Sequence, residues 1–118
     1  MKLLGIGDNV LDDYRWREEV YPGGNSVNVL ASRYDGSSTA YIGVLADDGA
    51  GLHFASALRE EGVDISRVRV MHGISARNYI ELDEAGDRHF VGNNGRETAQ
   101  YQALLCLTPG DYAMMEQY

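Results

Sequence analysis

The hydrophobic pattern of this chain changes between its two halves. In the first half, residues 2–7 and 39–44 form short apolar runs, which are typical of strands buried on both faces. In the second half, residues 75–82 and 88–92 alternate polar and apolar side chains on either side of a polar segment at 83–87. This alternation predicts a β-hairpin with one covered face and one solvated face. We therefore expect two sheets of different character.

Residues 14–21 mix aromatic and charged side chains, and they are predicted to form a further strand of the solvated kind. Together with residues 75–92 they would make a small sheet that is inserted into the rest of the chain. The remaining pattern runs strand, helix, strand, helix. That order is typical of an α/β fold with crossover connections between parallel strands.

Residues 25–34 have the spacing of an amphipathic helix, which Asn25 or Ser26 can cap. Its apolar stripe is predicted to consist of Val27, Leu30, Ala31 and Tyr34. Immediately before it stand Gly23 and Gly24, which let a ligand approach the backbone closely because they lack a Cβ atom. A polar ligand there would meet backbone N–H groups and the Asn28 side chain. This junction therefore predicts a binding site.

Two further helices have recognisable ends. Asp48 is expected to cap the first of them, with Gly62 as its C-terminal stop and Val63 packing back against it. Thr108 is expected to cap the second, which has proline at its first position and runs through Tyr118. The predicted inner face of the first helix carries Leu52, Ala55 and Leu58.

Charge and composition limit the classes of partner that this chain is expected to bind. The chain has 118 residues, which suits one domain, and a formal net charge of −8. This charge argues against a nucleic-acid or anionic-membrane partner, because both need clustered Lys and Arg. An apolar run of only two leucines before Gly5 predicts no signal peptide and no spanning helix. The single cysteine, Cys106, lies among leucines and is expected to be a buried structural thiol in a reducing cytoplasm.

Several polar residues have a structural interpretation beside a functional one. Asp8 and Asp12 can cap a turn after the first strand. Asp47 and Asp48 precede a helix and fit helix caps better than metal ligands. Residues 93–96 are first of all a turn. No metal-ligand spacing joins the three histidines, which are His53, His72 and His89.

Several ordered motifs resemble the N-terminal signatures of the ribokinase-like, or pfkB, carbohydrate kinases. They are Gly-Asp-Asn-Val-Leu-Asp at residues 7–12, Gly-Gly-Asn-Ser-Val-Asn at 23–28 and the stretch from Ile42 to Gly51. Residues 61–66, Glu-Gly-Val-Asp-Ile-Ser, are similar to the usual end of the following helix. Within the family, the Gly-Asp-Asn opening, the Gly-Gly-Asn-x-Val-Asn junction and the final segment from Asp111 to Tyr118 are most similar to the fructoselysine 6-kinase branch.

The resemblance implies a three-layer α/β/α body with a β-sheet lid, of which this chain would hold the N-terminal part. Lid strands are expected near residues 14–21 and 75–92. The reaction implied is transfer of the γ-phosphoryl group of ATP, with Mg²⁺, to a hydroxyl of a small-molecule sugar or fructosamine.

Site residues carry over from the resemblance position by position. Asp12 would accept hydrogen bonds from sugar hydroxyls, the backbone at Gly23 and Gly24 would line the sugar site, and Asn28 would hydrogen-bond the sugar. Arg96 follows a lid strand and is an alternative contact to the sugar or to a phosphate.

One departure from the family concerns activity. The family's catalytic base and nucleotide site lie in a Gly-Ala-Gly-Asp motif, and no such motif occurs in this sequence. The nucleotide-binding part is therefore expected to be absent from this chain, which alone would be inactive and would use neither ATP nor Mg²⁺. The alternative is a non-catalytic truncated product that binds sugar weakly or self-associates through its lid and sheet edge.

The lid strand at residues 75–82 carries a prediction of its own. Arg77, Tyr79 and Glu81 share one face of the strand, and the other face holds Ala76, Asn78, Ile80 and Leu82. In the family one lid face covers the sugar and the other often meets a second subunit, which implies a homo-oligomer such as a dimer. We expect the face with Ile80 and Leu82 to be buried.

Overall fold

A computed structural model of the chain describes residues 1–16, 20–22, 29, 33–99, 101 and 107–118. Strand β1 (Lys2–Ile6) pairs in parallel with β4 (Ser38–Ile42), from Lys2 opposite Ser38 to Ile6 opposite Ile42. Strand β5 (Val44–Ala46) continues from β4 and pairs in parallel with β6 (Arg69–Met71). Both predicted apolar runs are thus strands. The second is interrupted at Gly43 and extends beyond the predicted end.

Gly43, where the run is interrupted, is closely packed. A Cβ atom at this position would lie 2.0 Å from the Tyr41 hydroxyl oxygen and 2.6 Å from the carbonyl oxygen of Gly7. Tyr41 donates a hydrogen bond of 2.7 Å to that same carbonyl. Only glycine leaves room for this contact, which ties the end of β1 to the end of β4.

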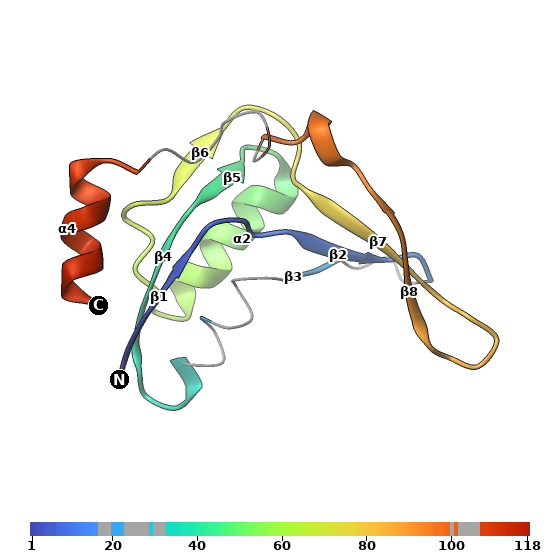
Figure 1. Cartoon of the computed structure of the whole chain (residues 1–118), viewed down its shortest axis with the longest axis horizontal. Helices are drawn as coiled ribbons and strands as arrows, with labels where there is room; N and C mark the ends of the chain where they lie inside the picture. Colours follow the sequence, from blue (N-terminus) through green and yellow to red (C-terminus); the bar gives the residue numbers. More distant parts are fainter. Residues whose placement is uncertain (17–19, 23–28, 30–32, 100, 102–106) are drawn as a thin grey trace.

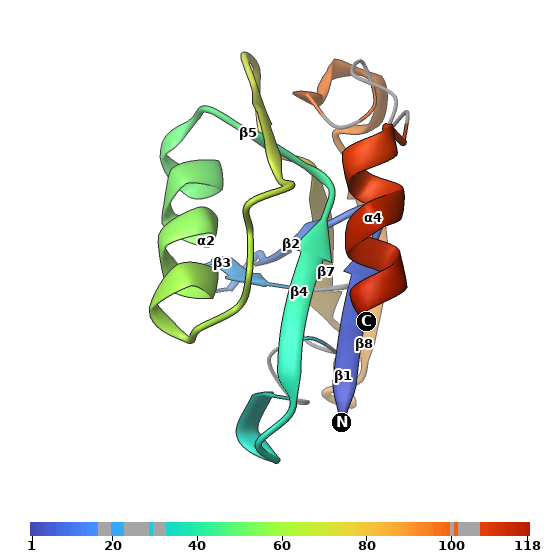
Figure 2. The same ribbon diagram turned by 90° about the vertical axis from the view of Figure 1, so that its left-hand side faces the viewer.

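Helices cover both faces of the β1–β4 pair, as Figure 2 shows. Helix α2 (Gly49–Glu60) lies on one side and α4 (Pro109–Gln117) on the other. Met114 of α4 packs with Ala40 and Ile42 of β4, and Leu4 of β1 joins this cluster. β1 is only half-buried rather than buried on both faces, because β4 is its single paired neighbour among the described residues. The arrangement is a three-layer α/β/α body.

Helix α2 begins and ends where the sequence predicts. The Asp48 side chain accepts a hydrogen bond of 2.8 Å from the backbone N–H of Gly51. At the other end Gly62 has a φ of +78°, and the N–H of Val63 donates to the carbonyl of Leu58. These features form a Schellman C-cap, in which Val63 and Leu58 are both buried.

The inner faces of two helices differ from the prediction. In α2, Phe54, Ala55 and Leu58 are buried, but Leu52 is 52% exposed. Phe54, which is two positions further along the helix, fills the core place assigned to Leu52. Of the helix predicted at residues 25–34, positions 25–28 and 30–32 lie outside the described residues. Val29 there is fully buried, whereas Tyr34 is 78% exposed, so the assignment of Tyr34 to the apolar stripe is wrong. The other three predicted members, Val27, Leu30 and Ala31, lie outside the described residues.

The helix predicted from Thr108 is confirmed as α4. Pro109 occupies its first turn, and the Asp111 side chain accepts a hydrogen bond of 2.7 Å from the backbone N–H of Thr108. Asp111 is fully buried and also binds Arg67 and Arg69, which come from the loop before β6 and from β6 itself. This group attaches α4 to the body. The prediction for Cys106 lies outside the described residues.

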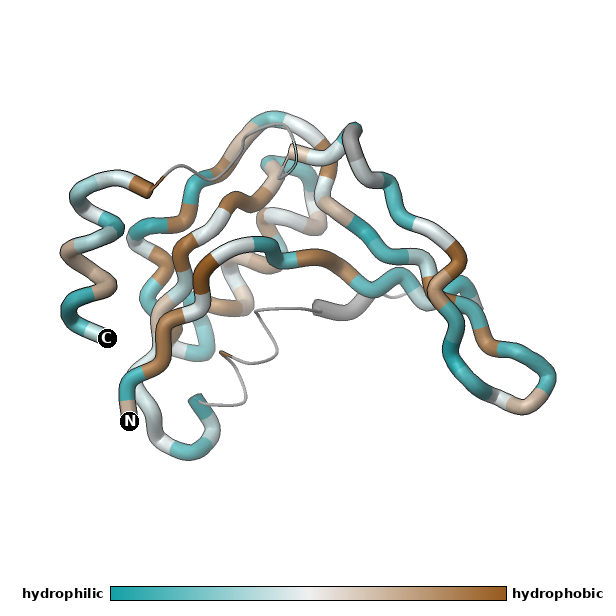
Figure 3. Tube along the Cα trace, in the orientation of Figure 1, coloured by the Kyte–Doolittle hydropathy of each residue, from teal (hydrophilic) through white to brown (hydrophobic). Residues whose placement is uncertain are grey.

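A second sheet extends away from the body, on the right of Figure 1. It contains β2 (Leu11–Tyr14), β3 (Val20–Pro22), β7 (Arg77–Leu82) and β8 (Arg88–Asn93), in the order β3-β2-β7-β8. We call it the outer sheet. The hairpin of β7 and β8 is confirmed, with Gly86 at a φ of +84° in its turn. Figure 3 shows that the end of this hairpin is largely hydrophilic.

The strand predicted at residues 14–21 is wrong in its extent. Tyr14 ends β2, the chain turns at Arg15 and Trp16, and β3 then pairs antiparallel with β2. The rings of Tyr14 and Trp16 pack edge to face at 5.1 Å, and the N–H of Arg15 donates to the carbonyl of Ile80. These contacts stabilise a turn where the alternation suggested a continuous strand.

The predicted burial of the Ile80 and Leu82 face is half right. Ile80 is 2% exposed, but Leu82 is 45% exposed. The pair of Tyr14 with Ile80 is the last one between β2 and β7, so no residue of β2 stands opposite Leu82. No helix in the described part of the chain is long and apolar enough to cross a membrane.

Candidate functional site

A cavity of about 320 Å³ opens where the outer sheet meets the body. Its walls come from the segment between β1 and β2, from β7 and the end of β8, and from the short 3-10 helix η1 (Gly95–Glu97). This volume is within the range of small-molecule sites, about 300–1,000 Å³. The lining residues are Asp8, Val10, Ala76, Arg77, Asn78, Asn93, Asn94, Gly95, Thr98 and Tyr101.

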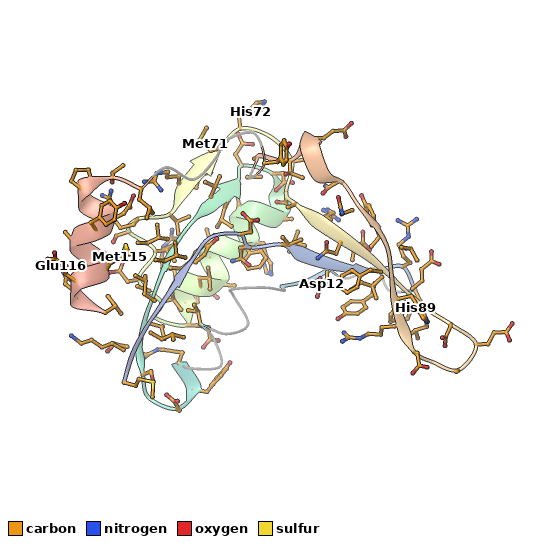
Figure 4. The ribbon with its side chains drawn as sticks, viewed as in Figure 1. Asp12, Met71, His72, His89, Met115 and Glu116 are labelled. Atoms are coloured by element: carbon orange, nitrogen blue, oxygen red, sulfur yellow. The ribbon has the colours of Figure 1, made fainter. Side chains whose placement is uncertain are left out.

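Three polar residues stand in one row across the outer sheet beside this cavity. Asp12 of β2 is in register with Asn78 of β7, which is in register with Asn93 of β8. Residues in register across a sheet share a face. The Asn78 amide donates a long hydrogen bond of 3.4 Å to the Asp12 carboxylate. Figure 4 shows Asp12 on the outer sheet, well away from Met115 and Glu116 of α4.

Asn94 fixes the cavity wall at the junction of β8 and η1. Its side-chain amide donates to the carbonyl of Ser75 at 2.9 Å, and its side-chain oxygen accepts from the N–H of Arg77 at 2.8 Å. The backbone N–H of Asn94 donates to the carbonyl of Arg77. The start of β7 and the end of β8 are therefore held together by one side chain and one backbone group.

Asp48 extends this wall to the N-terminus of α2. Besides capping the helix, it accepts hydrogen bonds from the Ser75 hydroxyl at 2.5 Å and from the Ser75 N–H at 2.7 Å. Burial acts to raise the pKa of Asp48, but the hydrogen bonds from Ser75 and Gly51 outweigh it, so the pKa is lowered. Asp48 thus remains a carboxylate that joins the body to the outer sheet, a positioning role in addition to the predicted cap.

The charges at the cavity are partly compensated. Arg77 lines it, and its guanidinium lies 3.6 Å from the Asp13 carboxylate. Asp8 contributes a carboxylate to the lining. The other polar lining side chains are neutral amides and the hydroxyls of Thr98 and Tyr101, which can both donate and accept hydrogen bonds. Such a set is suited to binding hydroxyl groups.

The structure places the predicted site residues unequally. Asp12 lies in β2 beside the cavity rather than capping a turn, and it contacts Asn78. Gly23, Gly24 and Asn28 lie outside the described residues. The backbone of Arg96 is in η1, next to the lining residue Gly95, while its side chain lies outside the described part. The residues predicted to form a turn at 93–96 run instead from the last residue of β8 into η1.

Asn78 and Asn94 were not singled out as site residues from the sequence. Asn78 carried a usable signal, because it is the polar member of a strand face otherwise formed by Ala76, Ile80 and Leu82. Asn94 had no comparable signal. Its role depends on hydrogen bonds to Ser75 and Arg77, which are distant in sequence.

Two of the three histidines pair with aspartates away from the cavity. His72 lies 2.9 Å from Asp47, and His89 lies 2.6 Å from Asp83 in the β7–β8 turn. Figure 4 shows the two histidines at separate places on the molecule. Asp47 does not cap α2. It binds His72 and the N–H of Gly73 instead. Among the described residues no group of three His, Cys, Asp or Glu side chains could hold a metal ion.

Comparisons with known proteins agree with this architecture. The chain is 44% identical over 96 residues to fructosamine kinase FrlD of Bacillus subtilis. This match covers 80% of this chain and 34% of the relative. It is 38% identical over 121 residues to fructoselysine 6-kinase of Escherichia coli, covering 100% of this chain and 44% of the relative. The chain thus spans less than half the length of these curated relatives.

Solved structures show the same fold. A sugar kinase from Pyrococcus horikoshii superposes with a TM-score of 0.77 at 18% identity, over 99% of this chain and 40% of that one. Fructokinase from Xylella fastidiosa superposes with a TM-score of 0.69 at 20% identity, over 84% of this chain and 34% of that one. The family model described as pfkB family carbohydrate kinase matches residues 11–115. This chain belongs to the pfkB family of carbohydrate kinases.

Proposed function

We propose that this chain supplies the sugar-binding site and the lid of an ATP-dependent kinase that phosphorylates a hydroxyl of a sugar or fructosamine. The observation that carries the proposal is the row of Asp12, Asn78 and Asn93 beside the cavity. A carboxylate and amides supply the directed acceptors and donors that a polyol needs. The names of the two curated relatives, fructosamine kinase and fructoselysine 6-kinase, point to the same substrate class.

Asp12 is proposed to accept hydrogen bonds from sugar hydroxyls. The backbone at Gly23 and Gly24 and the side chain of Asn28 are proposed to complete the sugar site, and Arg96 to contact the sugar or a phosphate. The outer sheet would act as the lid. We place this function in the cytoplasm, with no nucleic-acid or membrane partner.

ATP and Mg²⁺ are proposed to act only with the complete enzyme. The described cavity does not suit a triphosphate, because Asp8 lines it and Arg77 is already close to Asp13. Phosphoryl transfer depends on positioning and on charge stabilisation of the phosphate. We therefore expect the 118-residue chain to bind sugar without turnover.

Isothermal titration of the 118-residue chain with fructose, ribose and fructoselysine tests this proposal. The chain should bind at least one of them, and Asp12→Asn should weaken that binding by about tenfold, because a charge-assisted hydrogen bond is lost. Asp87→Asn, an exposed change in the β7–β8 turn, is the matched control and should leave binding unchanged. Binding that is equally strong in the Asp12 variant would refute the site.

A coupled ATP assay on the same chain with the same sugars tests the expected lack of turnover. No sustained ATP consumption should be measured. Sustained sugar-dependent turnover would show that the expectation of inactivity is wrong.

The alternative, a non-catalytic protein that self-associates, has one observation in its favour. β8 lies at the edge of the outer sheet, and Phe90 and Val91 on it are 73% and 52% exposed. A strand edge with exposed apolar side chains can pair with a second copy. Sedimentation over a range of concentrations tests this, since a concentration-independent monomer would exclude association through that edge.

A further inference from the structure

One wall of the cavity is the segment that connects β1 to β2. Its residues 8–10 form neither helix nor strand, and Asp8 and Val10 line the cavity. Gly7, which precedes them, has a φ of +115°, and glycine leaves the backbone more freedom than any other residue. The shape of this wall is therefore not set by regular secondary structure. It depends on contacts with other parts of the chain.

Tyr41 of β4 supplies such a contact from inside the body. It is fully buried, and its hydroxyl donates a hydrogen bond of 2.7 Å to the carbonyl of Gly7. The side chain of Asn9, which is also buried, interacts with the same hydroxyl. Tyr41 thus holds the residues on both sides of Asp8. Burial, together with the nearby Asp8 carboxylate, raises the pKa of Tyr41, so its hydroxyl keeps its proton and remains a donor.

The packing of the core does not require this hydroxyl. Tyr41 belongs to the apolar cluster that includes Leu45 and Leu58, where a phenylalanine ring would fill the same space. A buried hydroxyl costs free energy unless it is hydrogen-bonded, so tyrosine has an advantage over phenylalanine only through the groups that it binds. Room for it exists because a Cβ atom at Gly43 would lie 2.0 Å from the hydroxyl oxygen. The hydroxyl therefore acts on the connecting segment rather than on the core.

We propose that Tyr41 is a positioning residue for the cavity, whose buried hydroxyl fixes Gly7 and Asn9 and so holds residues 8–10 in the shape that a bound sugar meets. Tyr41 is not among the residues that line the cavity, so it acts on the ligand only through this segment. This inference rests on the proposed sugar-binding function of the cavity. It assigns the geometry of one cavity wall to a single hydroxyl in the core.

Tyr41→Phe tests the proposal because it removes the hydroxyl and keeps the ring. Isothermal titration with fructose and with fructoselysine, at a temperature where the variant is fully folded, should show affinity weakened about fivefold, as expected for the loss of one hydrogen bond. Amide chemical shifts of the free protein should change at residues 7–10. Val63→Ala removes apolar contacts from the same cluster and is the matched control. It should lower the Tm at least as much, but leave the affinity and these shifts unchanged.

A rescue separates the hydrogen bond from packing. The residue 4-aminophenylalanine at position 41 keeps the ring and places an N–H donor where the hydroxyl was, so it should restore both the affinity and the shifts. If Tyr41→Phe does not fold, Asn9→Ala removes the other group that the hydroxyl contacts, and it should weaken binding and change the same amide shifts.

The outcomes distinguish this inference from the proposed function. Native-like affinity in Tyr41→Phe, or in Asn9→Ala if the first variant does not fold, would overturn the inference and leave the proposed function standing. An equal loss of affinity in Val63→Ala would overturn it as well, since general loosening of the core would then explain the effect. Failure of the native chain to bind either sugar would contradict the proposed function. Unchanged shifts at residues 7–10 in Tyr41→Phe would overturn the present inference even then.

Discussion

The body and the outer sheet use similar side chains in opposite ways. In the body, Tyr41, Ile42, Leu45 and Leu58 are at most 1% exposed. In the outer sheet every residue of β8 is exposed. The body therefore buries its apolar groups within the chain, while the outer sheet leaves those of β8 exposed. A bound sugar beside the outer sheet is the occupant that we propose, and a second copy at its β8 edge belongs to the alternative.

Two aspartates show the same contrast among polar groups. Asp111 is fully buried and is bound by Thr108, Arg67 and Arg69. Asp12 is half-buried and accepts a hydrogen bond of 3.4 Å from Asn78. A carboxylate surrounded by protein donors stabilises the fold, whereas one with a long contact beside a cavity can bind a ligand at little structural cost.

The largest expected effect comes from shortening one leucine in each region. Leu58→Ala should lower the free energy of unfolding by about 3 kcal/mol, because it leaves a cavity in the core. Leu82→Ala, the same change at a half-exposed position, should cost less than about 1 kcal/mol. Urea unfolding measures both. Similar costs would show that the outer sheet is packed as tightly as the body.

Removal of the Asp111 charge should be the next largest effect. Asp111→Asn leaves Arg67 and Arg69 without their carboxylate partner and should lower the Tm by roughly 10 °C near neutral pH. Asp35→Asn is the matched control, since Asp35 is exposed and binds only its near neighbour Ser37 among the described contacts. It should change the Tm little.

The same aspartate predicts a pH dependence. The N–H of Thr108, with Arg69 and Arg67, holds the pKa of Asp111 well below its ordinary value, although burial acts in the opposite direction. A lowered pKa in the folded state means that the stability is present above about pH 4 and is lost as the pH falls below it. Between pH 7 and pH 2, the Tm should fall less steeply with decreasing pH for Asp111→Asn than for the native protein. Parallel curves of Tm against pH for the two proteins would contradict this role of Asp111.

A smaller effect is expected in the outer sheet. Ile80→Lys should lower the free energy of unfolding by about 2 kcal/mol, since a charged group replaces a buried apolar one. Leu82→Lys, two positions along the same strand, should stay within about 0.5 kcal/mol. Amide hydrogen exchange shows which strands lose stability in each variant. Native-like protection of β7 in Ile80→Lys would contradict the burial of this position.

The sequence was sufficient for the elements that rest on local signals. The caps at Asp48 and Thr108, the glycine at position 62 and the β7–β8 hairpin all depend on near neighbours, and all are confirmed. Positions that depend on tertiary packing were less predictable. Leu52 has helical spacing with Ala55, but the core receives Phe54 instead.

The candidate site was predictable only in part, for a related reason. Asp12 follows from a local motif and lies beside the cavity. Asn78 and Asn94 become site residues through the parallel pairing of β2 with β7 and through long-range hydrogen bonds to the backbone. The sequence indicates neither the partner strand nor its register. The wall of the cavity therefore emerged only from the structure.

The central claim is that the cavity beside Asp12 and Asn78 binds the sugar. Titration of the isotopically labelled 118-residue chain with 1-amino-1-deoxyfructose, followed by amide chemical shifts, tests it most directly. We predict saturable shifts at residues 8–12, 76–78 and 93–98, with α4 unchanged. Shifts confined to α4 or to the β7–β8 turn, or no saturable shift at millimolar ligand, would contradict the claim.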